Sequence, residues 1–346
     1  MLRLLEYPRL AAALLGGGAL IALIVILVLV FTGGDGRAGV TYTYVADEAD
    51  GAAVYFATGG EDDETFRLAA GLADVSGLRR SPTGGEIAFI ARDAAGLALF
   101  RVAEAEAAEL IRVELPGEPV DFVWSPDGLS MGYIVKESDG TFGLYVSALD
   151  DATPTLLATS PRPPTLGSWS PNLESFVYGL DEAGDNLGIF IKNPGGVNLI
   201  QLTFDADFSP VWSPDGDKIA FGSVRTGDLR QIFVVKPDGS ESVNVSGDEG
   251  DNTDFSWSPD SKRLLFVSDR TGNSEIFTVR ANGEDLQQLT SNSAAEAEPR
   301  WSDDGSQILF FSDASGEGDI FTMNADGSNQ RRISTSSSVR EHLADW

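Results

Sequence analysis

The chain has 346 residues, with 53 Asp and Glu against 24 Lys and Arg, a net charge of −29 and no cysteine. The lack of cysteine excludes disulfides, thiolate metal sites and a cysteine nucleophile. Binding to a phosphate backbone needs clustered Lys and Arg, so the strong negative charge excludes nucleic acid as a partner. The 19 Phe and 6 Trp, among 42% hydrophobic residues, supply enough apolar side chains for a large core.

The first predicted element is an uncharged apolar run at residues 10–31. As a helix these residues would span about 33 Å, about the hydrocarbon thickness of a bilayer, and the run is longer than the apolar part of a cleaved signal peptide. Arg3 and Arg9 precede the run and favour a cytoplasmic N-terminus. We therefore predict a single-pass cell-membrane protein with a cytoplasmic tail at 1–9, a transmembrane helix at 10–32, a linker at 33–40 and an extracytoplasmic domain at 41–346.

The rest of the chain repeats with a period of about 44 residues. Motifs of the Trp-Ser-Pro type begin at Trp124, Trp169, Trp212, Trp257 and Trp301. An aromatic residue follows nine residues after each motif start, and a second one follows eleven or twelve residues later, each within a branched apolar run that predicts a strand. The seven pairs are Tyr44/Tyr55, Phe89/Phe100, Tyr133/Tyr145, Tyr178/Phe190, Phe221/Phe233, Phe266/Phe277 and Phe310/Phe321.

Two further strands in each unit make it a four-stranded sheet, and radial repetition of such units is typical of a β-propeller. We predict an all-β fold, a seven-bladed β-propeller of four-stranded blades that is closed by the C-terminal strand and preceded by one N-terminal transmembrane helix. The predicted blades are residues 41–79 plus 337–346, 80–123, 124–168, 169–211, 212–256, 257–300 and 301–336.

The order of motifs within the repeat, WSPDG-x-x-IAF, S-x-R-T-G, IF-x-V and DG before a closing Leu-Thr, resembles the WD-repeat-like units of TolB-like propeller proteins. The resemblance covers residues 41–346 and is clearest where SVRTG (223–227), SDRTG (268–272) and SDASG (312–316) recur in register. It implies protein–protein binding at the cell envelope. The family's propeller has six blades, whereas this sequence contains seven units.

Acidic residues concentrate in the loops that enter the predicted innermost strands, and in a propeller these loops meet at one mouth of the central channel. We predict that this mouth holds a basic partner or a cation. The candidate binding residues are Asp205, Asp207, Asp251, Asp254, Glu296, Glu298, Glu341 and His342. No cofactor is predicted; calcium is the one metal ion considered, for the cluster Asp248-x-x-Asp251-x-x-Asp254, because it takes oxygen ligands.

No catalytic residue is predicted, because His342 is the single histidine of the chain and a Ser-His-Asp triad would have to be built around it. The leading hypothesis is a membrane-tethered, extracytoplasmic scaffold that binds an envelope protein or peptide of basic character. One alternative is a carboxylate- or metal-dependent hydrolase or lyase with its site at the channel mouth. Another is an extracytoplasmic ligand sensor. The sequence favours a protein that is not an enzyme without deciding the question.

Overall fold

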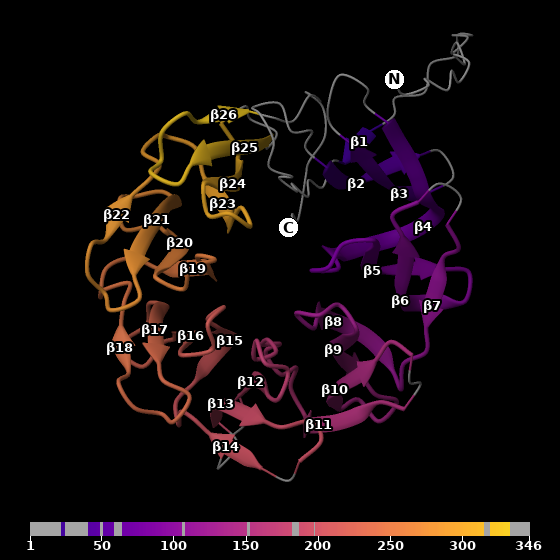
Figure 1. Cartoon of the computed structure of the whole chain (residues 1–346), viewed down its shortest axis with the longest axis horizontal. Helices are drawn as coiled ribbons and strands as arrows, with labels where there is room; N and C mark the ends of the chain where they lie inside the picture. Colours follow the sequence, from indigo (N-terminus) through magenta and orange to yellow (C-terminus); the bar gives the residue numbers. More distant parts are fainter. Residues whose placement is uncertain are drawn as a thin grey trace, which may run out of the picture.

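The computed structural model describes residues 22–24, 41–48, 51–58, 64–105, 108–150, 153–181, 187–196, 198–314 and 319–332. These residues contain 26 strands and no helix. The strands form sheets that follow one another around a ring (Figure 1). The described part of the chain is therefore an all-β propeller.

Hydrogen bonds divide the strands into six sheets, which we number in chain order. The first sheet consists of β1 (Ala22–Ile24), β2 (Thr41–Glu48), β3 (Gly51–Thr58), β4 (Glu64–Arg80), β5 (Glu86–Asp93), β6 (Gly96–Ala103) and β7 (Ile111–Val113). The second consists of β8 (Glu118–Trp124), β9 (Ser130–Lys136), β10 (Phe142–Ala148) and β11 (Thr155–Ser160). The third consists of β12 (Phe176–Asp181), β13 (Leu187–Lys192) and β14 (Leu199–Gln201).

The last three sheets have four strands each, with the first strand of each lying nearest the centre of the ring (Figure 1). The fourth sheet consists of β15 (Asp207–Trp212), β16 (Ile219–Ser223), β17 (Gln231–Val235) and β18 (Val243–Asn244). The fifth consists of β19 (Asn252–Trp257), β20 (Arg263–Ser268), β21 (Glu275–Arg280) and β22 (Gln287–Gln288). The sixth consists of β23 (Glu296–Trp301), β24 (Gln307–Ser312), β25 (Asp319–Asn324) and β26 (Arg331–Arg332).

The prediction of seven blades is wrong, because the described residues form six sheets. The first two repeats share one sheet, since β4 continues without interruption through 17 residues. Residues of β4 up to Leu72 pair with β3, and residues from Ala73 onward pair with β5. Irregularities in the register accompany this change of partner. The seven aromatic pairs therefore count sequence repeats, and two of these repeats lie in the same sheet.

The predicted transmembrane helix is also corrected. Within residues 10–32 the structure describes only Ala22–Ile24, and these form β1, an antiparallel partner of Val45–Asp47 in β2. Branched apolar residues such as Ile24 suit a strand as well as a membrane helix, so the apolar run alone did not settle the backbone conformation. None of the described residues belongs to a helix long and apolar enough to cross a membrane. The predicted closing strand at 337–346 lies outside the described residues.

The core lies between neighbouring sheets, and this explains the residue pattern of the strands. Every residue of β16 and β17 is buried, because other sheets cover both faces of these middle strands. The outermost strands β18, β22 and β26 contain no buried residue. Six of the aromatic pairs stack across the two middle strands with ring centroids 5.6 to 6.0 Å apart. Tyr44 and Tyr55 are likewise register partners in the first sheet.

The tryptophans of the repeat are packing residues that connect neighbouring sheets. Trp124 is buried and its indole N–H donates to the backbone carbonyl of Arg79 at 3.2 Å. Trp257 donates in the same way to the carbonyl of Val211 at 3.2 Å. In these two repeats the Trp at the end of an innermost strand thus fixes one sheet against the sheet before it, whereas the indole N–H groups of Trp169, Trp212 and Trp301 are buried without a hydrogen-bond partner among the described residues.

Candidate functional site

The first residue of each innermost strand in the fourth, fifth and sixth sheets is a buried polar residue. These residues are Asp207, Asn252 and Glu296, each no more than 2% exposed. They are register partners of Ser223, Ser268 and Ser312, the last residues of the neighbouring middle strands. Two of the predicted binding residues, Asp207 and Glu296, therefore occupy equivalent positions two sheets apart.

In the fourth sheet an arginine neutralises this position. Arg225 donates from Nη2 to Asp207 Oδ2, and its Nε lies 3.6 Å from Asp205 Oδ2. The guanidinium carbon lies 5.1 Å from the ring centroid of Phe221 and 4.7 Å from that of Phe233. Asp205 and Asp207, two predicted binding residues, thus share an arginine of their own chain.

The fifth sheet repeats this arrangement with an amide in place of the carboxylate. Arg270 donates from Nη2 to Asn252 Oδ1 at 2.7 Å and to the carbonyl oxygen of Ser246 at 2.8 Å. Its guanidinium carbon lies 5.6 Å from the Phe266 centroid and 4.9 Å from the Phe277 centroid. Burial lowers the pKa of Arg270, which is consistent with a guanidinium set among side chains rather than in open solvent.

In the sixth sheet the arginine is replaced by Ala314. The backbone shows that the three positions are equivalent, because the N–H groups of Arg225, Arg270 and Ala314 each donate to the hydroxyl of the serine two residues earlier. The distances are 3.2, 3.4 and 3.3 Å. Glu296 is therefore at the position equivalent to Asp207 and Asn252, but no arginine of its own sheet lies beside it at the position of Arg225 and Arg270.

A second buried carboxyl lies beside Glu296. Glu275, the first residue of β21, is 1% exposed, and Asn292 bridges the two acids. Asn292 donates its backbone N–H to Glu275 Oε1 at 2.8 Å and its side-chain amide to Glu296 Oε1 at 2.7 Å. The Oε2 atoms of both acids are buried without a hydrogen-bond partner among the described residues. We call Glu275 and Glu296 the interblade carboxyl pair.

The same interface one sheet earlier holds two amides instead. Gln231 corresponds to Glu275, and its Oε1 accepts a hydrogen bond from Asn252 Nδ2 at 2.8 Å. Two amides complement each other as donor and acceptor, whereas two carboxylates repel and can only accept. Burial raises the pKa of Glu296, Glu275 and Asp313 raise it further, and hydrogen bonds from Asn292 and Ser312 act against this rise.

The predicted residues Asp251, Asp254 and Glu298 do not join this cluster. Asp251 is held by Arg230, whose Nε lies 3.0 Å from both carboxylate oxygens and whose hydrogen bonds lower the pKa of Asp251. Asp254 and Glu298 lie at register irregularities in β19 and β23 with positive φ angles of 50°. They are equivalent positions on neighbouring innermost strands, and neither forms an ion pair with another described residue.

The calcium interpretation gains no support from these positions. Asp248 accepts a hydrogen bond from Asn244 at 2.9 Å, Asp251 is paired with Arg230, and Asp254 is exposed. Within the described ranges there is no group of three or more metal-binding side chains. Glu341 and His342 lie outside the described residues.

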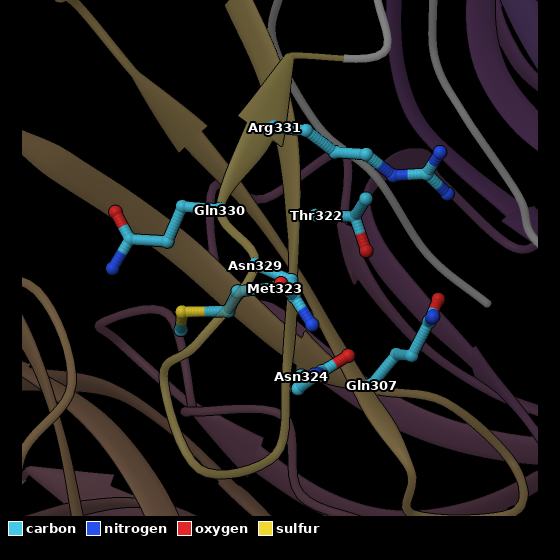
Figure 2. Close-up of a pocket in the computed structure, with 7 residues that line it drawn as sticks. All are labelled: Gln307, Thr322, Met323, Asn324, Asn329, Gln330 and Arg331. Carbon is cyan, nitrogen blue, oxygen red and sulfur yellow. The ribbon is translucent and has the colours of Figure 1, made fainter.

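Two surface pockets lie elsewhere. A polar pocket of about 470 Å³ lies at the outer strands of the sixth sheet (Figure 2). Figure 2 shows Thr322 and Arg331 on the side of β25 opposite to Met323. A second pocket, of about 620 Å³, lies between turns of the fourth and fifth sheets and includes Asp215 and Arg263. Neither pocket contains a predicted binding residue. The lining of the first is Gln307, Thr322, Met323, Asn324, Asn329, Gln330 and Arg331.

Sequence reasoning missed the two arginines, Asn292 and Glu275. The repeated motifs SVRTG, SDRTG and SDASG contain the signal for the arginines, because their third position is Arg225, Arg270 and then Ala314. The interblade carboxyl pair had no comparable signal, since its two members are 21 residues apart and meet only when neighbouring sheets pack.

Residues 208–344 match the model of the TolB beta propeller domain. No curated protein matches this sequence. Among solved structures, TolB from Acinetobacter baumannii is similar at 16% identity and a TM-score of 0.55, covering 89% of this chain and 82% of TolB. An oligogalacturonate lyase in complex with manganese gives 14% identity and a TM-score of 0.66, over 82% and 85% of the two chains.

The propeller domain of the trilobed protease from Pyrococcus furiosus is a third similar structure, at 11% identity and a TM-score of 0.65. It covers 90% of this chain and 98% of the protease domain. Identities this low show the fold alone. The predicted resemblance to TolB-like propellers is confirmed.

Proposed function

We propose that the chain is a binding scaffold whose innermost strands present acidic side chains to a basic protein or peptide. The observation that carries this proposal is the pair of equivalent acids on neighbouring innermost strands, Asp254 and Glu298, with no ion-pair partner among the described residues. The net charge of −29 supports it, because a strongly negative surface attracts and steers basic partners. A partner in the cell envelope remains part of the proposal.

Similarity to the lyase and the protease gives this chain a fold and no activity. The oligogalacturonate lyase and the trilobed protease share its propeller at 14% and 11% identity, which concerns the fold and no substrate. A propeller is a frame for many functions, and the function depends on the side chains placed on it. A location at the cell membrane, with the N-terminus in the cytoplasm and the propeller outside, stays a prediction based on the apolar run at residues 10–31.

The test compares two doubly neutralised variants of the tagged full-length chain. Asp254→Asn with Glu298→Gln removes the acids of the innermost strands. Glu109→Gln with Glu114→Gln removes two exposed acids that flank the outermost strand β7, so the change in net charge is the same.

We expect a protein captured from solubilised envelopes by the wild type to be lost with the first variant and kept with the second. Equal capture by all three chains would show that these acids do not form the binding surface. Equal loss of the captured protein with both variants would show that binding depends on net charge and not on these two acids. Either result would remove the support for this proposal.

A further inference from the structure

The repeat places a guanidinium at one defined position in two successive sheets. Arg225 and Arg270 each follow the first residue of their stacked aromatic pair by four positions in the sequence. The guanidinium group of each lies over both rings of that pair. Each also reaches the first residue of the innermost strand, Asp207 or Asn252. The position thus offers an aromatic surface on one side and a buried acceptor at its end.

The sixth sheet keeps both parts of this position. Phe310 and Phe321 stack with centroids 5.6 Å apart, and Glu296 supplies the acceptor. Phe321 is only partly buried, whereas its equivalents Phe233 and Phe277 are 7% and 3% exposed. Ala314 is exposed, and its side chain ends at Cβ, so it cannot lie over these rings as an arginine does.

The acceptor itself indicates a charged ligand. Glu296 is 1% exposed, yet its Oε2 atom has no partner among the described residues. Glu275 beside it has the same deficit. A buried carboxylate oxygen without a donor is costly, even where the other oxygen of the same group accepts a hydrogen bond, as Oε1 of both acids does. A cationic donor relieves both the missing hydrogen bond and the repulsion between the two acids.

We infer that the sixth sheet binds an arginine side chain of the partner, in the position that Arg225 and Arg270 occupy in the preceding sheets. This inference rests on the proposed function and specifies the chemistry of the partner. A guanidinium is planar, stacks on aromatic rings and donates two parallel hydrogen bonds to a carboxylate. A lysine ammonium supplies charge but neither the planar stacking nor the paired donors.

The probe for this site is arginine with acetyl and methylamide ends, compared with the same derivative of citrulline, which has nearly the same shape but no charge. Calorimetric titration of the full-length chain should give saturable binding of the arginine derivative in the millimolar range. The citrulline derivative should bind at least about tenfold more weakly, because its neutral urea group cannot form an ion pair with the carboxylates.

Two variants locate the binding. Ala314→Arg supplies the guanidinium from the chain itself, so it should abolish probe binding and raise the melting temperature. Leu129→Arg adds the same charge at an exposed turn between β8 and β9 and should change neither. Glu296→Gln removes the charged acceptor but keeps its shape, so the chain should stay folded and lose probe affinity at least about tenfold.

Absence of saturable binding at concentrations of the arginine derivative up to roughly 20 mM would overturn the inference, because a ligand of this size that fits the site should bind below this concentration. Unchanged affinity in both Ala314→Arg and Glu296→Gln would also overturn it. The probe needs no partner, so its failure is distinct from failure of the scaffold proposal. If the chain captured a partner through Asp254 and Glu298 but did not bind the arginine derivative, the scaffold proposal would stand and the arginine site would be ruled out.

Discussion

Arg225 and Arg270 have the same place in the repeat but neutralise different groups, and this difference sets what each contributes to stability. Arg225 pairs with Asp207, a carboxylate with no exposed side-chain surface, while Arg270 donates to the amide oxygen of Asn252. Loss of one partner from a buried ion pair leaves an uncompensated charge, whereas loss of a donor to an amide leaves an unsatisfied neutral group.

We therefore expect Arg225→Ala to lower the free energy of unfolding by about 3 to 5 kcal/mol and Arg270→Ala by about 1 to 3 kcal/mol. Both variants lose a guanidinium stacked on two aromatic rings, so that contribution cancels in the comparison. Urea denaturation at neutral pH measures both. Equal losses would mean that stacking, rather than the charge of Asp207, determines the effect.

Glu296 should make the stability of the protein depend on pH. Its pKa in the folded protein is raised above the ordinary value of 4.5, chiefly by burial and further by Glu275 and Asp313. The folded state then holds this proton more tightly than the unfolded state, so stability falls as the pH rises from 4.5 through the raised pKa.

Glu296→Gln removes this loss, because a glutamine keeps the shape and never ionises. We expect the variant to gain stability relative to the wild type as the pH is raised from about 5 to about 8, by urea denaturation at each pH. A difference that stays flat over this range would show that the Glu296 carboxyl ionises as freely in the folded protein as in the unfolded chain.

The loop between β18 and β19 shows how a connecting segment fixes a side chain in the next sheet. Gly247 and Gly250 both have positive φ angles, 76° and 65°, which glycine adopts without the cost that a side chain brings. A Cβ atom at Gly247 would meet nothing within 4 Å. A Cβ atom at Gly250 would lie 2.6 Å from the backbone nitrogen of Arg270.

We expect Gly247→Ala to cost about 1 kcal/mol, from the left-handed conformation alone. Gly250→Ala should cost about 2 to 4 kcal/mol, because the backbone of Arg270 must also move and its hydrogen bonds to Ser246 and Asn252 weaken. Thermal and urea denaturation of the two variants gives the comparison. Similar losses of stability in the two variants would mean that the loop can move to accept the new Cβ atom without displacing Arg270.

The turns after the tryptophans show which elements the sequence could predict. In the turn at 213–218 the hydroxyl of Ser213 donates to Asp215 Oδ1 at 2.6 Å, and Gly216 has a φ of 77°. The equivalent serine and aspartate of the turns at 125–130, 258–263 and 302–307 form the same hydrogen bond. Such turns and the paired aromatics depend on residues close in sequence, so their spacing predicted them.

The arrangement of the whole ring depends on interactions that no short motif contains. The strand β4 joins two repeats because residues 64–80 form one strand, although Gly71 and Gly77 within it have the positive φ angles of turn residues. The interblade carboxyl pair likewise forms only when the fifth and sixth sheets meet. The repeat type was therefore predictable from the sequence, whereas the number of sheets and the buried part of the candidate site were not.

The charge of the whole molecule opposes its compact state. With 53 acids and 24 Lys and Arg, most carboxylates have no basic residue to pair with, and the repulsion among them acts over the whole surface. Surface ion pairs such as Arg92–Asp74 and Lys262–Asp260 act in the opposite direction, but water and salt screen exposed pairs, so each contributes little. Repulsion should therefore dominate the response to salt.

We expect the melting temperature to rise as NaCl is increased from about 0.05 M to about 0.5 M, because the screening length shortens from roughly 14 Å to roughly 4 Å over this range. KCl at the same ionic strength should give the same rise, since screening does not distinguish the two cations. The fourfold variant with neutral side chains at Glu109, Glu114, Asp254 and Glu298 should respond less steeply, because it has less repulsion to screen. A melting temperature that falls with salt would mean that ion pairs outweigh the repulsion, and a response specific to one cation would indicate bound ions instead of screening.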